Sequence, residues 1–134
     1  DIYISAAAVA DFRPIKVSEQ KIKKKGNNEK ISLPLERTHD IIASLGAQKT
    51  HQFICGFAME TENLVGNAVE KMRGKNMDMI VANSLKTEGA GFAGNTNVCT
   101  LISASGQKDL PLMDKEDVAH AILDEILGIF AAKR

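Results

Sequence analysis

The sequence predicts an α/β fold, a Rossmann-like three-layer arrangement with a mostly parallel sheet. Short apolar runs alternate along the chain with segments in which apolar residues recur at helical spacing. Strands and helices that alternate in this way form right-handed βαβ units, whose helices cover both faces of a sheet. With 134 residues, 44% of them hydrophobic, the chain is long enough to bury a core, so we expect a single domain over residues 1–134.

The first half of the chain predicts two strands around a long polar segment. Residues 1–5 form a short apolar run and residues 53–58 an unbroken one, as expected for a strand covered on both faces. Residues 13–30 are polar and rich in lysine, so we expect a flap-like loop there. Residues 31–35 predict a short extended piece, in which Pro34 favours a position at a sheet edge.

Three helices are predicted. The first begins at Thr38, whose hydroxyl can cap it by accepting a bond from a free backbone N–H, and it ends at Gly46. The second covers residues 62–75, where apolar residues recur every three or four positions. The third follows Asp114 as its cap, and acidic residues in its first turn complement the helix dipole. Its inward face is expected at Ile122, Ile126, Ile129 and Phe130.

Two further strands are predicted in the second half, at residues 77–82 and 98–103. A loop punctuated by Gly89, Gly91 and Gly94 separates them. With the earlier elements, these strands complete the pattern of strands and helices that favours a mostly parallel sheet.

Composition argues against several classes of function. Lysine and arginine together number 17, as do aspartate and glutamate, so no global field favours nucleic acid. No apolar run approaches the roughly 20 residues that span a bilayer, and no signal peptide is evident, so we expect a cytoplasmic protein without membrane contact. Cys55 and Cys99 are too few for a disulfide framework and are expected to be free thiols. No metal site is predicted, because ligand spacing is absent among the histidines His39, His51 and His120.

One stretch near the start of the chain predicts a site for a nucleoside triphosphate. Residues 6–14 combine a run of alanines with Asp11, and lysines cluster at residues 21–25. Small side chains let the backbone approach a ligand closely, and a carboxylate can engage ribose or a phosphate-bound metal. Lysine ammonium groups can neutralise phosphate charge.

This stretch resembles the signature of phosphopantothenoylcysteine synthetase, a coenzyme A pathway enzyme whose bacterial form is commonly fused behind a flavin-dependent decarboxylase. The resemblance covers essentially all 134 residues. Nothing in the chain corresponds to the glycine-rich first turn and asparagine-bearing loop of the family, which implies the C-terminal part of a synthetase domain without its N-terminal βα units. Further motifs match in order and near-spacing: Asp40–Ile42, Gly56–Ala58 with Glu60 and Thr61, Lys71, Lys75 and Asn76, Ile80–Asn83, and Gly91–Phe92.

The resemblance implies a reaction and its partners. It implies CTP-dependent ligation of 4′-phosphopantothenate to L-cysteine through an acyl-cytidylate, giving 4′-phosphopantothenoylcysteine, CMP and pyrophosphate. Mg²⁺ is expected to accompany CTP, FMN is expected only in a fused decarboxylase domain outside this chain, and the protein is expected to be a homodimer. Attack at the α-phosphorus builds charge on the phosphates, so such a site needs positioned cations and backbone N–H groups.

The resemblance also assigns residues to this reaction. Lys21 corresponds to the essential flap lysine of the family and is the predicted catalytic residue, in contact with CTP. Ala8 lies where the family contacts the acyl group of phosphopantothenate. The sequence departs from the family at Ser5, where glycine is common, and at His39, where proline is usual. The other predicted CTP contacts are Ser5, Ala6, Ala7, Asp11, His39, Asp40, Ile41, Ile42, Phe57, Lys71 and Lys75.

Plainer interpretations of the same residues remain open. Lys21, Lys71 and Lys75 could be solvated charges, Phe57 a core residue, and residues 6–10 a tightly packed turn. The alternative function is a non-catalytic nucleotide-binding or assembly module derived from this fold. A nicotinamide-dependent reductase is disfavoured because no Gly-x-Gly-x-x-Gly follows any predicted strand.

Overall fold

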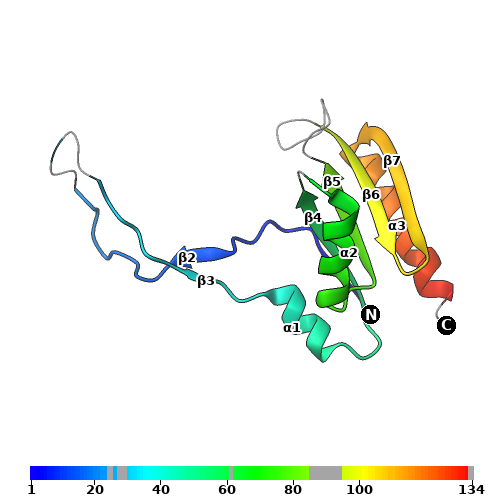
Figure 1. The fold of residues 1–134 in the computed structure, drawn as a ribbon, viewed down its shortest axis with the longest axis horizontal. Helices are drawn as coiled ribbons and strands as arrows, with labels where there is room; N and C mark the ends of the chain where they lie inside the picture. The colour runs from blue at the N-terminus through cyan, green and yellow to red at the C-terminus, as the bar shows by residue number, and fades with distance from the viewer. Residues whose placement is uncertain (24–25, 27–29, 61, 85–94, 133–134) are drawn as a thin grey trace. The chain divides into compact units, whose positions relative to one another are not determined.

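The computed structural model describes residues 1–23, 26, 30–60, 62–84 and 95–132 (Figure 1). The chain divides into two compact units. We call Asp1–Ala6 with Ile41–Arg134 the sheet unit, and Ala7–Asp40 the hairpin unit. Several predicted features lie outside the described residues: Lys24, Lys25, Thr61, the glycine-punctuated loop and the motif Gly91–Phe92.

The sheet unit contains a five-stranded sheet in the order β1-β4-β5-β6-β7. β1, β4 and β5 pair in parallel, whereas β6 pairs antiparallel with both β5 and β7. β6 alone therefore runs against the other four strands. This mixed, mostly parallel sheet confirms the predicted α/β fold. The strands are β1 Ile2–Ser5, β4 Phe53–Glu60, β5 Met79–Ser84, β6 Thr96–Ser103 and β7 Gly106–Asp114.

Helices cover both faces of this sheet and so form three layers (Figure 1). α1 (Ile41–Gln48) and α2 (Leu64–Gly74) pack on one face, and α3 (Lys115–Ala132) packs on the other. In the part of the chain that the structure describes, no helix is both long enough and apolar enough to cross a membrane.

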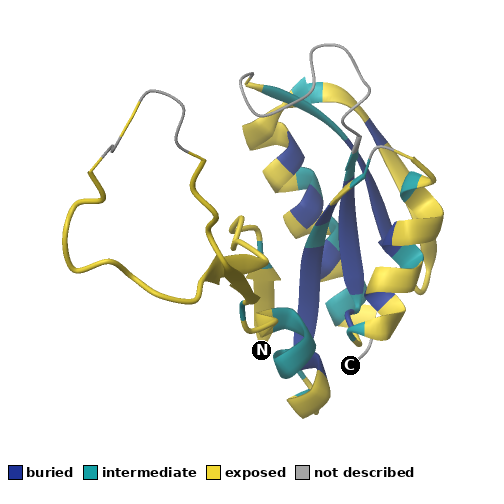
Figure 2. Cartoon of the chain, turned by 60° about the vertical axis from the view of Figure 1, so that its left-hand side comes forward, coloured by how far each residue is buried: buried dark blue, intermediate teal, exposed yellow. Residues whose placement is uncertain are grey.

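Side chains that alternate along the central strands form two cores, one on each face of the sheet. In β4, Phe53 and Cys55 face α3 and pack with Ile126, whereas Ile54 and Ala58 face α1 and α2. Figure 2 shows these strands as the buried centre of the sheet unit. Period-two alternation under two helical layers explains why the central strands are apolar at nearly every position.

Two boundary predictions for α1 are wrong. α1 begins at Ile41, so Thr38 does not cap it; Thr38 instead donates from Oγ1 to the Ala10 carbonyl at 2.6 Å and from its N–H to the Asp11 carbonyl at 2.9 Å. Gly46 lies inside the helix and is buried. A Cβ at this position would collide with the carbonyl oxygen of Lys75, so glycine permits the close approach of α1 to the end of α2.

The sequence did not indicate β7, which forms a hairpin with β6. β7 is an edge strand and carries Pro111, which an edge position tolerates because no neighbour needs its missing N–H. Gly106 opens β7 with a φ of 130°, a conformation that side chains disfavour. This hairpin accounts for the antiparallel part of the sheet.

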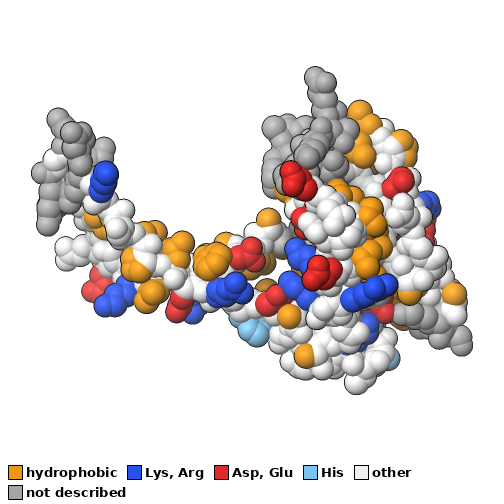
Figure 3. Space-filling model, viewed as in Figure 1, with side chains coloured by type: hydrophobic (Ala, Val, Ile, Leu, Met, Phe, Trp, Pro, Cys, Tyr) orange, Lys and Arg blue, Asp and Glu red, His pale blue; other side chains and the backbone are white. Residues whose placement is uncertain are grey.

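The hairpin unit is built on two short antiparallel strands, β2 (Phe12–Pro14) and β3 (Leu35–Arg37). The Arg13 Nε atom pairs with the Glu36 Oε1 atom at 2.8 Å, and the Arg37 guanidinium lies 5.9 Å from the centroid of the Phe12 ring. The extended piece predicted at residues 31–35 is therefore displaced to β3. None of the described residues of this unit is buried, as the exposed colouring in Figure 2 shows. Hydrophobic side chains are exposed along its surface (Figure 3).

Candidate functional site

The carboxyl ends of the parallel strands define one edge of the sheet. Ser5 pairs in register with Gly56, and Glu60 pairs with Ser84. β4 therefore continues four residues beyond the end of β1, and the chain leaves β1 through Ala6. Open α/β sheets bind ligands outside the carboxyl ends of their strands, so this edge is the candidate binding region.

Predicted CTP contacts near this edge differ in exposure. Ser5 is half-buried and Ala6 is exposed. Ile41 opens α1 with an exposed side chain, whereas Ile42 packs against the core beneath α1 and α2. Because its side chain contributes to the core, Ile42 can contact a nucleotide only through its backbone, where a helix begins.

Phe57 and the lysines of α2 lie on different sides of the sheet. The Phe57 side chain packs against the core beneath α3. Lys71 lies in the last turn of α2, which covers the opposite face. The sheet therefore separates the ring of Phe57 from α2, and its stacking on a base stays a prediction.

The end of α2 places Lys71 and Lys75 beside the end of α1. Lys75 follows the last helical residue and donates its backbone N–H to the Lys71 carbonyl at 3.2 Å. Asn76 donates from Nδ2 to the Gly46 carbonyl at 2.9 Å. Among the described residues, none forms a hydrogen bond or ion pair with the exposed Lys71 ammonium. Lysines at this position are also favoured by the helix dipole, so placement alone does not distinguish a binding role from a structural one.

The hairpin unit brings Asp11 close to His39 and Asp40, which are distant in sequence. The two hydrogen bonds from Thr38 to Ala10 and Asp11 continue the β2–β3 pairing by one step. Asp11, His39 and Asp40 are all exposed. A carboxylate and an imidazole are therefore accessible at one end of this ladder.

Lys21 lies in the same unit with an exposed side chain. Within the described part of the chain, no residue forms a hydrogen bond or ion pair with its ammonium group. Ala7 and Ala8 are exposed as well. The unit thus carries an unengaged cation and a stretch of backbone that no bulky side chain covers.

Metal binding by protein side chains alone finds no support in the described residues, among which no three His, Cys, Asp or Glu side chains are grouped as ligands. Mg²⁺ in nucleotide sites is commonly held by one or two carboxylates together with substrate phosphates. The exposed carboxylate of Asp11 fits that mode of binding.

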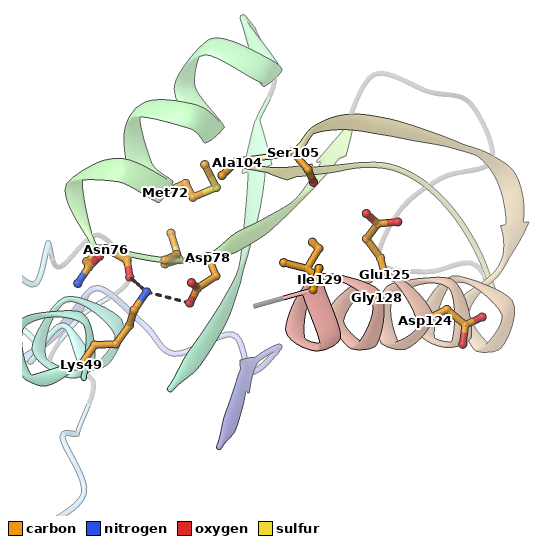
Figure 4. A pocket seen from close by; sticks show the side chains of 12 residues that line it. Lys49, Met72, Asn76, Asp78, Ala104, Ser105, Asp124, Glu125, Gly128 and Ile129 are labelled. Atoms are coloured by element: carbon orange, nitrogen blue, oxygen red, sulfur yellow. Dashed lines mark hydrogen bonds and ion pairs between the residues drawn. The ribbon is translucent and has the colours of Figure 1, made fainter. Parts of the chain in front are cut away.

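The structure reveals a buried polar cluster that sequence reasoning missed. The Lys49 Nζ atom lies 2.8 Å from the Asp78 Oδ2 atom, and their side chains are only 14% and 6% exposed. The Ile54 N–H also donates to Asp78 Oδ2, at 2.8 Å. In the sequence, Asp78 interrupts a pattern of apolar residues typical of a strand. A buried carboxylate requires a partner, so this position was the one sequence feature that could have indicated the cluster. The pair borders a cavity of about 540 Å³ that none of the predicted CTP contacts lines (Figure 4).

The topology and the accessible strand ends define a Rossmann-like α/β domain of the kind that binds ligands at the carboxyl edge of its sheet. The chain belongs to the family of the DNA/pantothenate metabolism flavoprotein C-terminal domain, whose model matches residues 1–129. This membership confirms the relationship inferred from the sequence motifs.

Known relatives agree with this assignment. The chain is 45% identical over 130 residues to the coenzyme A biosynthesis bifunctional protein CoaBC of Bacillus subtilis, a match that covers 96% of this chain and 32% of that protein. It thus spans about a third of the length of this curated relative. A solved structure of the C-terminal domain of a CoaBC protein matches with a TM-score of 0.74 and 38% identity, over 98% of this chain and 58% of that one.

A more distant solved structure shares the fold. The solved structure of a Cab2 mutant in complex with phosphopantothenate-cysteine matches this chain with a TM-score of 0.70 and 18% identity. The match covers 95% of this chain and 43% of that one. At this identity the similarity concerns the fold alone.

Proposed function

We propose that the chain is part of a phosphopantothenate–cysteine ligase, which joins 4′-phosphopantothenate to L-cysteine at the expense of CTP in coenzyme A biosynthesis. The observation that carries this proposal is the 45% identity to a CoaBC protein over 96% of the chain. The solved CoaBC C-terminal domain, similar over 98% of the chain, supports it further.

The proposed reaction has two steps. The carboxylate of phosphopantothenate attacks the α-phosphorus of CTP, which forms an acyl-cytidylate and releases pyrophosphate. The amino group of cysteine then attacks the acyl carbon, loses a proton, and displaces CMP as the amide bond forms. Both steps change the charge on phosphate oxygens, so the protein has to supply positive charge and N–H donors rather than a nucleophile.

Lys21 is the proposed catalytic residue. Its ammonium is exposed and no described residue engages it, so it can contact phosphate oxygens without first breaking an ion pair. The small residues Ser5, Ala6 and Ala7 are proposed to offer backbone to the nucleotide, and Ala8 to the acyl group. Bound Mg²⁺ would add charge neutralisation at the phosphates, with Asp11 as its protein ligand.

The other proposed nucleotide contacts come from α1 and α2. Backbone N–H groups at the start of α1, at Ile41 and Ile42, suit an anion because they lack partners within the helix. Lys71 and Lys75 would add two ammonium groups at the end of α2. Asp40 and His39 precede α1 and are proposed as further contacts.

Pyrophosphate release by the full-length protein tests this function. We expect release from CTP only when phosphopantothenate is present, and equal use of ATP would contradict the specificity for CTP. Lys21→Gln should lower kcat by about a hundredfold or more, because a cation at the developing charge is lost. Lys16→Gln, at another exposed lysine of the hairpin unit, is the matched control and should retain activity. CTP binding without ligation in the unmodified protein would favour the alternative of a non-catalytic module.

We also propose that the protein is a homodimer in which a second copy covers the hairpin unit. The described residues of this unit have no buried core, and an isolated two-stranded ladder is marginal in water. Apolar residues exposed on one unit at this density are typical of an interaction surface. The large exposed side chains are Val9, Phe12, Ile15, Val17, Ile22, Ile31, Leu33 and Leu35.

Sedimentation equilibrium tests the proposed dimer. Leu33→Asp should weaken self-association by placing a charge in the interface. Leu127→Asp is the control, because Leu127 is similarly exposed, at 57% against 59%, but lies on α3 of the sheet unit. A monomeric unmodified protein, or equal effects of the two changes, would contradict the proposal.

A further inference from the structure

A cavity of about 540 Å³ opens between the end of α2 and the last turns of α3 (Figure 4). This volume lies within the range of small-molecule sites, about 300–1,000 Å³. The cavity belongs entirely to the sheet unit, and none of the residues proposed to bind CTP lines it.

Apolar and polar groups line different parts of this cavity. Met72, Met77 and Ile129 supply apolar surface, and thioether side chains adapt readily to the shape of a ligand. Figure 4 shows the Lys49–Asp78 pair on one side and Glu125 projecting from α3 toward Ser105. A predominantly apolar wall with a few placed polar groups is the usual composition of a binding site for a small molecule.

The donors around the cavity are already engaged. Lys49 Nζ donates to Asp78 Oδ2 at 2.8 Å and to the Asn76 carbonyl at 2.9 Å. Lys108, which does not itself line the cavity, donates to Glu125 Oε2 at 3.3 Å. The Asn76 side-chain amide donates to the Gly46 carbonyl. Each of these two ammonium groups is already paired with a carboxylate, so an anion in the cavity would have to compete with that carboxylate.

Acceptors, in contrast, remain available. Glu125 uses one carboxylate oxygen for Lys108, and no described residue donates to its other oxygen, Oε1. The carboxylate of Asp124, also in the lining, has no partner among the described residues. Among the described residues that line the cavity, three carry a carboxylate, Asp78, Asp124 and Glu125, and one carries an ammonium group, Lys49. The cavity therefore favours a ligand that brings positive charge and hydrogen-bond donors.

We propose that this cavity binds a small organic cation, a primary amine that carries a compact apolar group. The ammonium pairs with Glu125, and the apolar group packs against Met72, Met77 and Ile129. This site is independent of the proposed ligase activity, so the failure of either proposal leaves the other standing.

Titration of the ¹⁵N-labelled 134-residue chain with two probes tests the proposal. The probes are 2-phenylethylamine and 3-phenylpropanoate, which share a ring and linker and differ in the charged group. We expect the amine to shift amide signals of Asn76, Ser105 and Gly128, and to bind about tenfold or more tightly than the carboxylate. Equal affinities, or shifts confined to residues outside the lining, would overturn the proposal.

Two variants locate the binding. Gly128→Leu should abolish binding by filling the cavity, because a Cβ at Gly128 meets no heavy atom within 4 Å and the residue lines the cavity. Glu125→Gln should weaken amine binding about tenfold and leave the carboxylate probe unchanged. Glu116→Gln, at an exposed position in the first turn of α3, is the control and should change neither affinity. Unchanged amine binding in Gly128→Leu or Glu125→Gln would place the ligand elsewhere.

Discussion

The sheet unit and the hairpin unit carry the same kinds of apolar side chains, but the sheet unit buries many of them whereas the hairpin unit leaves them exposed. In the sheet unit, Phe53 and Ile126 are each 1% exposed. In the hairpin unit, Val17 is 89% exposed and Ile31 is 63% exposed. Burial of apolar surface is the main favourable term in folding, so the hairpin unit cannot gain its order from a core of its own. This contrast is the reason for assigning its apolar surface to a second copy.

The same contrast extends to ion pairs. Lys49–Asp78 in the sheet unit and Arg13–Glu36 in the hairpin unit both have an N–O distance of 2.8 Å. The side chains of the first pair are 14% and 6% exposed, whereas those of the second are 68% and 44% exposed. Equal geometry in unequal solvent exposure should give very different contributions to stability.

Replacement of the basic residue in each pair should reveal the largest difference between the units in the cost to the free energy of unfolding. Lys49→Met leaves the buried Asp78 carboxylate without its ammonium partner and should cost about 3–5 kcal/mol in free energy of unfolding. Arg13→Met should cost no more than about 0.5 kcal/mol, because water already solvates that pair. Urea unfolding measures both values, and similar costs would remove the distinction between the units.

Truncation of one isoleucine in each unit sharpens the comparison of apolar side chains. Ile126→Ala creates a cavity in the core beneath α3 and should cost about 2–5 kcal/mol. Ile31→Ala removes an exposed side chain and should change the stability of the isolated chain by less than about 0.5 kcal/mol. If a second copy covers Ile31, the cost of its truncation should appear only at concentrations that support the dimer.

Two glycine substitutions test how closely the helices of the sheet unit are packed. Gly46→Ala should cost about 1–3 kcal/mol, because its Cβ would collide with backbone that cannot move aside freely. Gly74→Ala is the control at the end of α2, where a Cβ meets no heavy atom within 4 Å. It should stabilise the protein by about 0.4–1 kcal/mol through a less flexible unfolded chain. Thermal or urea unfolding of both variants decides whether Gly46 is required.

The most gradual expected effect is a dependence of stability on alkaline pH that arises in the sheet unit. Burial raises the pKa of the Cys55 thiol from 9.0 to about 12. Folding therefore favours the neutral thiol, and this contribution is complete below pH 9.0 and is lost as pH rises toward 12. The loss should be about 1.4 kcal/mol per pH unit within that window.

Unfolding of Cys55→Ala beside the unmodified protein isolates this dependence, because other groups titrate equally in both. The difference in unfolding free energy between the two proteins should change from pH 9.0 toward pH about 12 and stay constant below that range. A difference that stays constant would show that the thiol does not titrate differently in the folded state.

Strands covered on both faces were predictable because burial on two sides leaves a continuous apolar run, as in residues 53–58 and 79–82. β7 was missed because an edge strand with Pro111 and polar residues carries no such run. Thr38 was misassigned as a cap because a tertiary hydrogen bond to Ala10 competes with the local one. From sequence, Gly46 favours a helix exit, because its real constraint, the Lys75 carbonyl, lies far along the chain.

The functional residues also fall into two groups, those that local sequence motifs indicate and those that only the fold brings together. The roles proposed for Lys21 and Asp11 came from short local motifs that resemble those of the family. The Lys49–Asp78 pair and the cavity beside it join residues far apart in sequence, so no local sequence pattern predicts them. Only the acid between two methionines just before β5, Asp78, pointed to a buried partner.

The register of β1 has a consequence for the order in which the sheet assembles. The connections that join β5 to β6 and β6 to β7 are short. The connection between β1 and β4 is much longer, because the whole hairpin unit and α1 separate Ile2 from its partner Phe53. Closing so long a loop costs chain entropy before the contacts of β1 can offset that cost. β1 should therefore dock last and open first, and its amides should exchange with deuterium sooner than those of the sheet centre.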